Sequence, residues 1–515
     1  MGSGLLHFRR LVTVVRTLVR HDALFPLEKL GLPRVAGAFL RIILFAPRIE
    51  GARDKRAGER LTHALTALGP AFIKLGQALS VRPDLIGDQM ANDLSLLQDR
   101  LPSFAGLEAR RAIEVEFQKG TDELFFEFDN KAIAAASIAQ VHRATTADGK
   151  EVAVKVLRPG IEAAFARDLT LAHWAAVRLE RARPELGRLR PIDTVRTIVR
   201  SVEMEMDLRF EAAAAEELRD NFKDEIGFDV PEVDWVRTGR RVLTTSWVDG
   251  DPINAINVGN ITDRDPRQIV EKFAKVFFLQ VFRDGFFHAD LHPGNFFIAT
   301  DGGIHVVDFG IMGRLDRRTR HYLAEMLHGF LTANYKRVAD VHIRAGYVPA
   351  DQSADEFAQA ARSIAEPILG LPMGEVSLAK LLAQLFSVTQ KFDMQVQPQL
   401  LLLQKTMLIA EGVGRNLCPN INMWELALPL VEDWMMEELG SEARLREATD
   451  SVFDGLERLP ALMAEMEGSI GMAARKGIRL NPESLTDLTK RSGENFWKIW
   501  AAAAALAIIV IMLLD

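Results

Sequence analysis

The sequence predicts an α+β protein in which a small β-rich lobe and a larger helical lobe follow an N-terminal helical extension. Three observations lead to this prediction. Residues 1–105 read as helices, residues 106–160 contain alternating and β-branched runs with a hairpin signal, and the chain after about residue 250 is again mostly helical. An apolar stretch near the C-terminus adds a predicted transmembrane helix.

Composition sets the broad class of the protein. The chain has 515 residues, 48% hydrophobic and 26% charged, which suits a folded chain of about three structural units. The net charge of −7 argues against nucleic acid as a partner, because nucleic-acid binding usually needs a strongly basic surface. The single cysteine, Cys418, allows no internal disulfide and no cysteine-based zinc site, which fits a reducing compartment.

The N-terminal segment 5–25, LLHFRRLVTVVRTLVRHDALF, reads as a basic amphipathic helix. Four arginines precede the first acidic residue, Asp22. This pattern is compatible with a mitochondrial presequence, with a helix lying on an anionic membrane, or with an ordinary surface helix. No run of apolar residues at this end is long enough for a secretory signal.

A second helix is predicted in LGPAFIKLGQALSVRPDL, starting at Pro70 and ending at Arg82-Pro83. A buried stripe is expected from three residues at helical spacing: Phe72, Leu75 and Leu79. Lys74 and Gln77 share another face, and Gly76 between them would let another backbone approach closely. Periodicity alone reads Lys74 as a solvated lysine.

Strand signals fill LFFEFDNKAIAAASIAQVHRATTADGKEVAVKVLRPG, with a hairpin turn at Asp148-Gly149. Alanine favours helices, so AIAAASIAQV is also compatible with a helix; the flanking strands favour a tight strand-to-strand turn. In EVAVKV, alternate valines share one face, and Lys155 points the other way with Ala153.

Two later segments complete the lobes. SVEMEMDLRFEAAAAEELRDNF reads as a helix on which Asp207 and Glu211 share a face, by default a solvated acidic one. RRVLTTSWVDGDP reads as a strand and a turn, and residues 265–290 as one long core helix.

The strongest chemical signal is FFHADLHPGNFFIATDGGIHVVDFG. Asp290 and Asn295 lie five positions apart in a polar loop, and Asp308 heads a turn after the strand IHVV. This order is typical of phosphotransferases, in which one carboxylate orients the acceptor while an asparagine and a second carboxylate hold Mg²⁺ on the nucleotide phosphates. The hairpin between Asn295 and Asp308 is expected to bring these two ligands together.

With this loop as an anchor, Lys155 is expected to contact the nucleotide phosphates and to need a glutamate partner. Glu211 is the candidate, with Glu203 and Glu205 as alternatives. The stretch LTTSWVDG falls where a kinase hinge would contact adenine through its backbone.

Four motifs together resemble the UbiB family, atypical protein-kinase-like proteins required for ubiquinone (coenzyme Q) biosynthesis. They are KLGQ from Lys74, the alanine-rich AAASIAQVH from Ala134, EMD from Glu205 with Glu211 after it, and HADLHPGN with DFG. The resemblance covers roughly residues 30–420. It implies a protein-kinase-like bilobal fold and an ATP-binding, ATP-hydrolysing protein whose K-x-G-Q helix packs over the site of a protein substrate.

The resemblance also assigns roles to residues. The implied catalytic residues are Asp290, Lys155, Glu211, Lys74 and Gln77. The implied nucleotide contacts are Ala134, Ala135, Ala136, Ser137, Ile138, Ala139, Gln140, Val141, Lys155, Glu205 and Asp207. The implied Mg²⁺ ligands are Asn295 and Asp308. Alanines in place of glycines predict a loop with fewer geometries and restrained phosphoryl transfer.

The expected domain order has five parts: a helical extension (1–105), an N-lobe (106–248), a C-lobe (249–430), a helical segment (431–495) and a membrane anchor (496–514). The anchor is a charge-free run from Ile499 to Leu514, somewhat shorter than the usual span of about 20 residues. Flanking tryptophans and upstream basic residues favour a bacterial inner-membrane tail with the body in the cytoplasm. A buried core helix is the alternative, and some family members end in two spans.

Three functions follow as hypotheses. The first is a membrane-anchored atypical kinase or ATPase in ubiquinone biosynthesis, with membrane lipid, ubiquinone precursors and other proteins of that pathway as partners. The second is a small-molecule phosphotransferase of the aminoglycoside or choline kinase type, which shares the H-x-D-L-H-P-G-N loop but lacks K-x-G-Q. The third is a nucleotide-gated, lipid-binding scaffold. The sequence identifies neither the phosphoryl acceptor nor the oligomeric state.

Overall fold

The computed structural model describes residues 2–439 apart from several gaps. The gaps are residues 24–44, 48, 50, 52–53, 81–85, 96, 98–101, 183–190, 254, 256–264, 370–383, 385–391, 393, 395–396 and 419–422. The predicted membrane anchor, residues 496–514, lies outside the described residues. Within them, no helix has the length and apolar character needed to cross a membrane.

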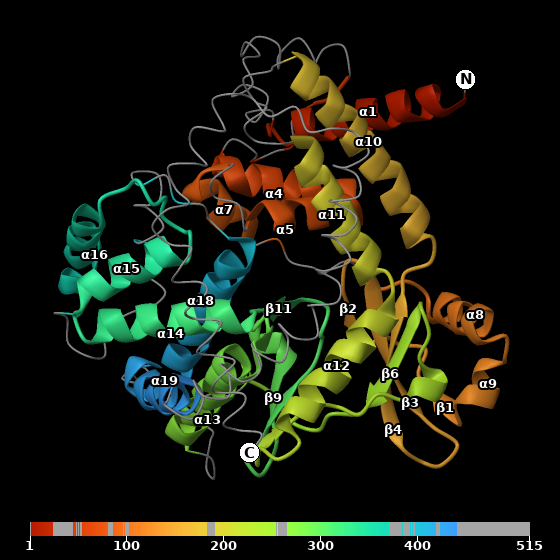
Figure 1. The fold of residues 1–515 in the computed structure, drawn as a ribbon. Helices are drawn as coiled ribbons and strands as arrows, with labels where there is room; N and C mark the ends of the chain where they lie inside the picture. Colours follow the sequence, from red (N-terminus) through yellow and green to blue (C-terminus); the bar gives the residue numbers. More distant parts are fainter. Residues whose placement is uncertain are drawn as a thin grey trace, which may run out of the picture. The chain divides into compact units, whose positions relative to one another are not determined.

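The N-terminal extension forms helices, as the sequence predicts. They are α1 (Gly2–Arg20), α4 (Ala57–Leu68), α5 (Pro70–Ser80) and α7 (Asp88–Ser95) (Figure 1). Helices α4, α5 and α7 pack on one another around a small core that includes Leu61, Leu65, Leu94 and Leu97. Helix α1 is fixed by Arg10, whose guanidinium donates to both carboxylate oxygens of Asp168, at 2.8 and 2.7 Å.

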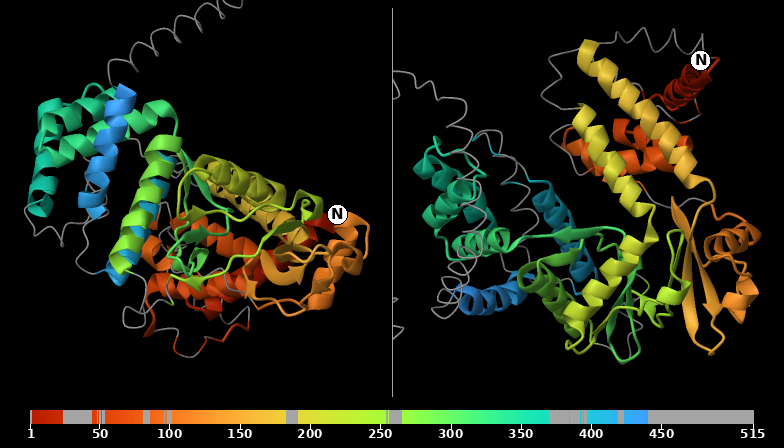
Figure 2. Two further views of the ribbon diagram at one scale, coloured as in Figure 1. Left: turned by 90° about the horizontal axis from the view of Figure 1, so that it is seen from below. Right: turned by 45° about the vertical axis from the view of Figure 1, so that its right-hand side comes forward.

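Helix α5 is packed on two sides. Besides α4 and α7, it contacts α10 (Ile161–Ala182) and α11 (Pro191–Glu205), which run side by side in Figures 1 and 2. Its best-buried side chains are therefore Ala71 and Ile73, 5% and 0% exposed. The residues of the predicted stripe, Phe72, Leu75 and Leu79, are only partly buried.

Gly76 of α5 faces the core of the extension. A Cβ at this position would lie 2.3 Å from Cδ1 of Leu97 and 2.7 Å from Cδ1 of Leu65. The prediction that Gly76 admits another backbone is therefore wrong, because the close neighbours are leucine side chains.

The small lobe is built on an antiparallel sheet with the order β1-β3-β4-β6, in which β2 also pairs with β3. Its strands are β1 (Glu127–Phe128), β2 (Ala134–Ala135), β3 (Ala139–Thr145), β4 (Glu151–Leu157) and β6 (Val242–Ser246). The predicted hairpin turn is present, with Gly149 at φ 82°. Two helices not expected from the sequence, α8 (Gly106–Phe117) and α9 (Thr121–Leu124), add Ala109, Ile113 and Leu124 to the valine core of this sheet.

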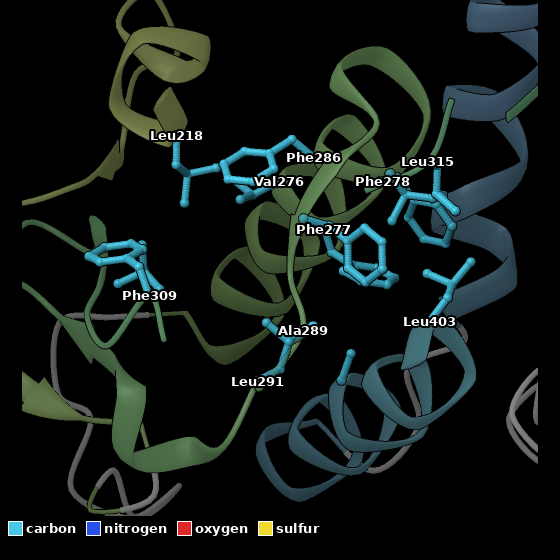
Figure 3. Packing of buried hydrophobic residues seen from close by; sticks show 14 of the residues in the cluster. Leu218, Val276, Phe277, Phe278, Phe286, Ala289, Leu291, Phe309, Leu315 and Leu403 are labelled. Carbon is cyan, nitrogen blue, oxygen red and sulfur yellow. The ribbon is translucent and has the colours of Figure 1, made fainter. Parts of the chain in front are cut away.

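The larger lobe combines helices with two small sheets. In the described part of the chain, α12 (Leu208–Phe222) follows α11 and also packs on β6 of the small lobe. The later described helices are α13 (Pro266–Phe278), α14 (Arg317–Leu331), α15 (Tyr335–Arg344), α16 (Ala354–Leu369), α18 (Pro398–Leu417) and α19 (Met423–Leu439). The sheets are β5 (Phe228–Asp229), β10 (Ile304–Val306), β9 (Phe296–Ile298) and β7 (Asp251–Pro252) in that order, and β8 (Phe286–His288) with β11 (Met312–Arg314). Figure 3 shows Phe277, Phe278, Leu315 and Leu403 in the shared hydrophobic core.

The predicted helix 265–290 is shorter than expected. Helix α13 continues as a π-helical turn, η4 (Leu279–Asp284), and ends at Gly285. Gly285 adopts φ 64°, which favours glycine, and a Cβ there would lie 2.4 Å from the carbonyl oxygen of Leu315. Strand β8 can therefore begin directly after it and lead into the polar loop at Asp290.

A pair of glycine substitutions tests the packing of α5. Gly76→Ala should lower the free energy of unfolding by about 1–3 kcal/mol, because the new methyl group overlaps two buried leucines. The control is Gly412→Ala in α18, where nothing lies within 4 Å of the new Cβ; helix propensity predicts a gain of up to about 1 kcal/mol. Thermal and denaturant midpoints measure both. Equal effects of the two changes would contradict the packing assigned to Gly76.

Candidate active site

Lys155 lies at the centre of the candidate site. Strand β4 buries Val152, Val154 and Val156 on one face and presents Lys155 on the other, as the alternation predicts. Its ammonium donates to Glu211 at 2.7 Å and to Asp308 at 2.8 Å. One cation therefore joins three elements that are far apart in the sequence: β4, α12 and the loop after β10.

The two carboxylates are in different environments. Glu211 is 8% exposed, whereas the side chain of Asp308 is 48% exposed. Burial raises the pKa of Glu211 to about 7 against the opposing effect of Lys155. Lys155 holds the pKa of Asp308 well below its usual range. Burial alone would lower the pKa of Lys155, but Asp308 and Glu211 outweigh it and raise that pKa. Asp308 is thus the carboxylate that keeps its charge and can be reached from solvent.

Asp207 positions Glu211 indirectly. Its carboxylate caps α12 by accepting from the backbone N–H of Arg209 at 3.2 Å, and the Arg209 guanidinium donates to both its oxygens at 2.8 and 2.6 Å. Glu211 follows within the first turns of α12. Asp207 therefore caps α12, and the expected solvated face is wrong because Glu211 is buried. The nucleotide contact of Asp207 stays a prediction.

His288 orients the two functional loops. The backbone N–H of Asp290 donates to its Nδ1 at 3.2 Å, so Nε2 carries the proton and donates to the carbonyl oxygen of Asp308 at 2.9 Å. The ring is fully buried, and burial lowers its pKa, in agreement with this neutral tautomer. His288 is a site residue that the sequence reading missed, although it stands two positions before Asp290.

Backbone pairing holds the segments of the two sequence-predicted metal ligands, Asn295 and Asp308, next to each other. The backbone N–H of Val307 donates to the carbonyl oxygen of Asn295 at 2.9 Å, and Nδ2 of Asn295 donates to the carbonyl oxygen of Asp290 at 3.1 Å. Asp308 adopts φ 65°, a left-handed conformation uncommon outside glycine and characteristic of functional turns.

The donor set fits Mg²⁺ only in company with phosphates. No group of three His, Cys, Asp or Glu side chains able to hold a metal occurs in the described part of the chain. One carboxylate and one amide oxygen are a suitable protein share for Mg²⁺, which usually keeps water and substrate phosphates as its other ligands. When a metal ion binds, Asp308 would leave its contact with Lys155 and contact the metal instead.

The alanine-rich segment forms a tight strand-to-strand turn, as predicted. Ala134 pairs with Val141 and Ala135 with Gln140, and the N–H of Ala136 donates to the carbonyl oxygen of Ala139 at 2.8 Å. None of the residues of this fully described turn has a positive φ. Alanine therefore fits its backbone, and glycine is not required.

Arg158 and Ser137 add polar features to the turn. Arg158 braces it by donating to the carbonyl oxygens of Ala136 and Pro102 at 3.2 and 3.0 Å. Ser137 is fully buried, and its hydroxyl finds no hydrogen-bond partner among the described residues.

The residues of the turn do not share one face. Val141 lies opposite Lys155 across the β3–β4 pair, so both side chains are on the same side of the sheet. Gln140 is 1% exposed and is bonded to the backbone of Phe104 and to His142. Its side chain is thus committed to the interior of the small lobe and not to the predicted nucleotide face. Ile138 belongs to the hydrophobic core that also contains Ala71 of α5.

Lys74 is not a solvated lysine. Its ammonium pairs with Glu205, at the end of α11, at 2.8 Å, and the two side chains are 10% and 16% exposed. Lys155, and to a lesser extent Lys74, lower the pKa of Asp308. Gln77 follows on the same helix and is partly buried. Glu205 is thus the ion-pair partner of Lys74, and Glu211 is the partner of Lys155.

Helix α18 also reaches the loop of Asp290. The ammonium of Lys405 lies 4.0 Å from Oδ1 of Asp290, and Thr406 Oγ1 lies 3.2 Å from the carbonyl oxygen of Ala289. Sequence reasoning missed both residues. The available signal was the polar interruption QKT within the apolar run LLLQKTMLIA.

Comparison with known proteins decides the family. Residues 96–342 match the ABC1 atypical kinase-like domain, and residues 361–422 match the UbiB helical domain. "Probable protein kinase UbiB" of Marinobacter nauticus is 40% identical over 449 residues, which cover 86% of this chain and 81% of the relative. The chain belongs to the UbiB family. The UbiB relative of Pseudomonas entomophila is 38% identical over 514 residues, covering 98% and 93% of the two chains.

A solved structure, that of Rv3197 with erythromycin from Mycobacterium tuberculosis, covers 72% of this chain and 94% of its own with 26% identity and a TM-score of 0.49. The segment matched by the UbiB helical domain contains Lys405 and Thr406. Residues 96–342, which match the ABC1 atypical kinase-like domain, contain Lys155, Glu211, Asp290 and Asp308.

Substitution of Asp207 distinguishes a helix cap from a direct contact. Asp207→Ala should lower the free energy of unfolding by about 1 kcal/mol and weaken nucleotide binding, because α12 carries Glu211. Asp207→Ser should restore both properties, since serine also caps helices. Calorimetry and thermal unfolding measure these effects.

The matched control is Asp265→Ala, which removes the equivalent cap of α13. It should lower stability without changing nucleotide binding. If Asp207→Ser bound nucleotide as poorly as Asp207→Ala, the carboxylate itself would be a ligand.

Proposed function

We propose that the chain is a membrane-associated atypical kinase or ATPase that binds Mg-ATP and supports ubiquinone biosynthesis. The observation that carries this proposal is the contact of Lys155 with Glu211 and Asp308, beside a loop that holds Asp290 and Asn295. The membership of the UbiB family, whose curated relatives are named as probable protein kinases, supports the same reaction class.

Each residue has a role in this proposal. Lys155 would contact nucleotide phosphates while Glu211 keeps it in place, and Asn295 and Asp308 would hold Mg²⁺. A bound Mg²⁺ would neutralise charge on the phosphates. Asp290, 33% exposed, orients the accepting hydroxyl or water and takes its proton.

The position of α5 favours a small acceptor. The pair between Lys74 and Glu205 fixes α5 against α11, and Ala71 of α5 joins the same core as Ile138 of the alanine-rich turn. An extended protein substrate would have to compete with this helix. Water or a small molecule is therefore the proposed acceptor.

Membrane association is part of the proposal. On α1, Arg9, Arg16 and Arg20 are exposed, while Val15, Leu18 and Val19 pack inward. This basic face suits an anionic membrane surface. We further propose the inner membrane of a bacterium, with the tail of residues 496–514 as anchor, and ubiquinone precursors or other proteins of that pathway as partners.

Loss of Asp308 tests the proposal. Asp308→Asn should reduce Mg²⁺-dependent ATP turnover by about 100-fold or more, because one metal-binding charge is removed. Asp301→Asn is the control, since Asp301 lies on the same hairpin and its substitute can still accept from the N–H of Gly303. Steady-state phosphate release measures both. Undiminished turnover by Asp308→Asn would refute the assignment.

The pathway is tested separately in cells that lack the protein. Wild type should restore ubiquinone levels and Asp290→Asn should not, as measured by lipid extraction and chromatography. Restoration by Asp290→Asn would mean that catalysis is dispensable for this function.

A further inference from the structure

Lys405 stands out among the charged residues of the larger lobe. Helix α18 contributes Leu403, Ala410, Val413 and Leu417 to the main hydrophobic core. Lys405 lies within this apolar helix, yet its side chain is one-third exposed and directed to the loop of Asp290. The packing of α18 gives no reason for a lysine at this position.

Thr406 fixes the register of α18 on that loop. Its side chain is fully buried, and Oγ1 lies within hydrogen-bond distance of the carbonyl oxygens of Ala289 and Leu402, at 3.2 and 2.8 Å. Ala289 and Leu291, on either side of Asp290, are buried in the same core (Figure 3). Lys405 and Asp290 are therefore held opposite each other by rigid, buried neighbours.

The distance between them is informative. The Nζ of Lys405 lies 4.0 Å from Oδ1 of Asp290, beyond hydrogen-bond range, whereas Lys155 and Lys74 contact their carboxylates at 2.7 and 2.8 Å. The side chains of Lys405 and Asp290 are each 33% exposed, so a ligand can reach both. An acceptor hydroxyl or water bound beside them would donate to the carboxylate, and an anionic oxygen of the adjacent phosphoryl group would accept from the ammonium.

We propose that Lys405 is a further catalytic residue, which holds an oxygen of the transferring phosphoryl group while Asp290 orients the acceptor. This inference rests on the proposed function. In phosphoryl transfer the P–O bond to the leaving nucleoside diphosphate breaks as the bond from the acceptor oxygen forms, and the acceptor's proton passes to Asp290. Negative charge on the phosphoryl oxygens persists throughout, so a fixed cation beside Asp290 stabilises the transition state. The segment matched by the UbiB helical domain would thus supply part of the active site.

The test compares wild type with Lys405→Met, Lys405→Arg and Asp308→Asn. Lys405→Met should lower kcat for ATP turnover about 10- to 100-fold with the KM for ATP changed by less than about threefold, because the lost contact acts in the transition state. Lys405→Arg should keep most of the rate. Binding of Mg-ADP with aluminium fluoride, a mimic of the transferring group, should weaken in Lys405→Met while binding of Mg-ADP alone is unchanged.

A structural lysine provides the control. Lys272 of α13 is also partly buried and donates to the carbonyl oxygen of Gly302 at 3.1 Å. Lys272→Met should leave kcat and aluminium fluoride binding unchanged even where it lowers the thermal midpoint. The proposal would be overturned in favour of a structural role by the following combination of results. Lys405→Met would bind Mg-ADP more weakly and unfold at a lower temperature, and Lys405→Arg would also lose its rate of ATP turnover.

The outcomes separate this proposal from the proposed function. Full turnover by Lys405→Met, in an assay where wild type is active and Asp308→Asn is not, overturns the role of Lys405 alone. If wild type is no faster than Asp308→Asn, the proposed function fails and the role of Lys405 fails with it. If Lys405→Met does not fold, full retention of aluminium fluoride binding by Lys405→Gln would overturn the proposal.

Discussion

The contact of one ammonium with two carboxylates is the constraint on which the site depends. Lys155 joins β4, α12 and the turn of Asp308, which are far apart in the sequence. Other interactions position its partners. Asp207 caps α12, His288 holds the backbone of Asp308, and the hydrophobic core fixes the loop of Asp290 from beneath. Together these interactions fix the positions of Glu211, Asp308 and Asp290.

The two carboxylates that contact Lys155 differ in exposure and in pKa. Glu211 is buried, and burial raises its pKa. Asp308 is half exposed, and Lys155 keeps its pKa low. Asp308 is therefore the partner that can move to a metal ion, leaving Lys155 with Glu211. On α5, Lys74 is held by its pair with Glu205 at the end of α11. These contacts are the basis of the proposed nucleotide site.

Short-range patterns in the sequence were sufficient to predict several features of the site. Alternation in EVAVKV predicted the face of Lys155, and the spacing of Asp290, Asn295 and Asp308 predicted one polar site. Tertiary packing decided what local patterns could not. Gly76 packs against buried leucines, and the side chain of Gln140 is hydrogen-bonded inside the small lobe. Lys405 lies on a helix more than 100 positions beyond Asp290. Alternation and motif spacing carry no information on contacts of this range.

The central claim is that Lys155, Glu211 and Asp308 form a nucleotide site in which Asp308 exchanges Lys155 for Mg²⁺. The most direct measurement is an experimental structure with Mg²⁺ and a non-hydrolysable ATP analogue. The expected result is phosphates beside Lys155, the metal on Asn295 and Asp308, and the contact between Lys155 and Glu211 retained. A nucleotide bound elsewhere, with Asp308 still paired to Lys155, would contradict it.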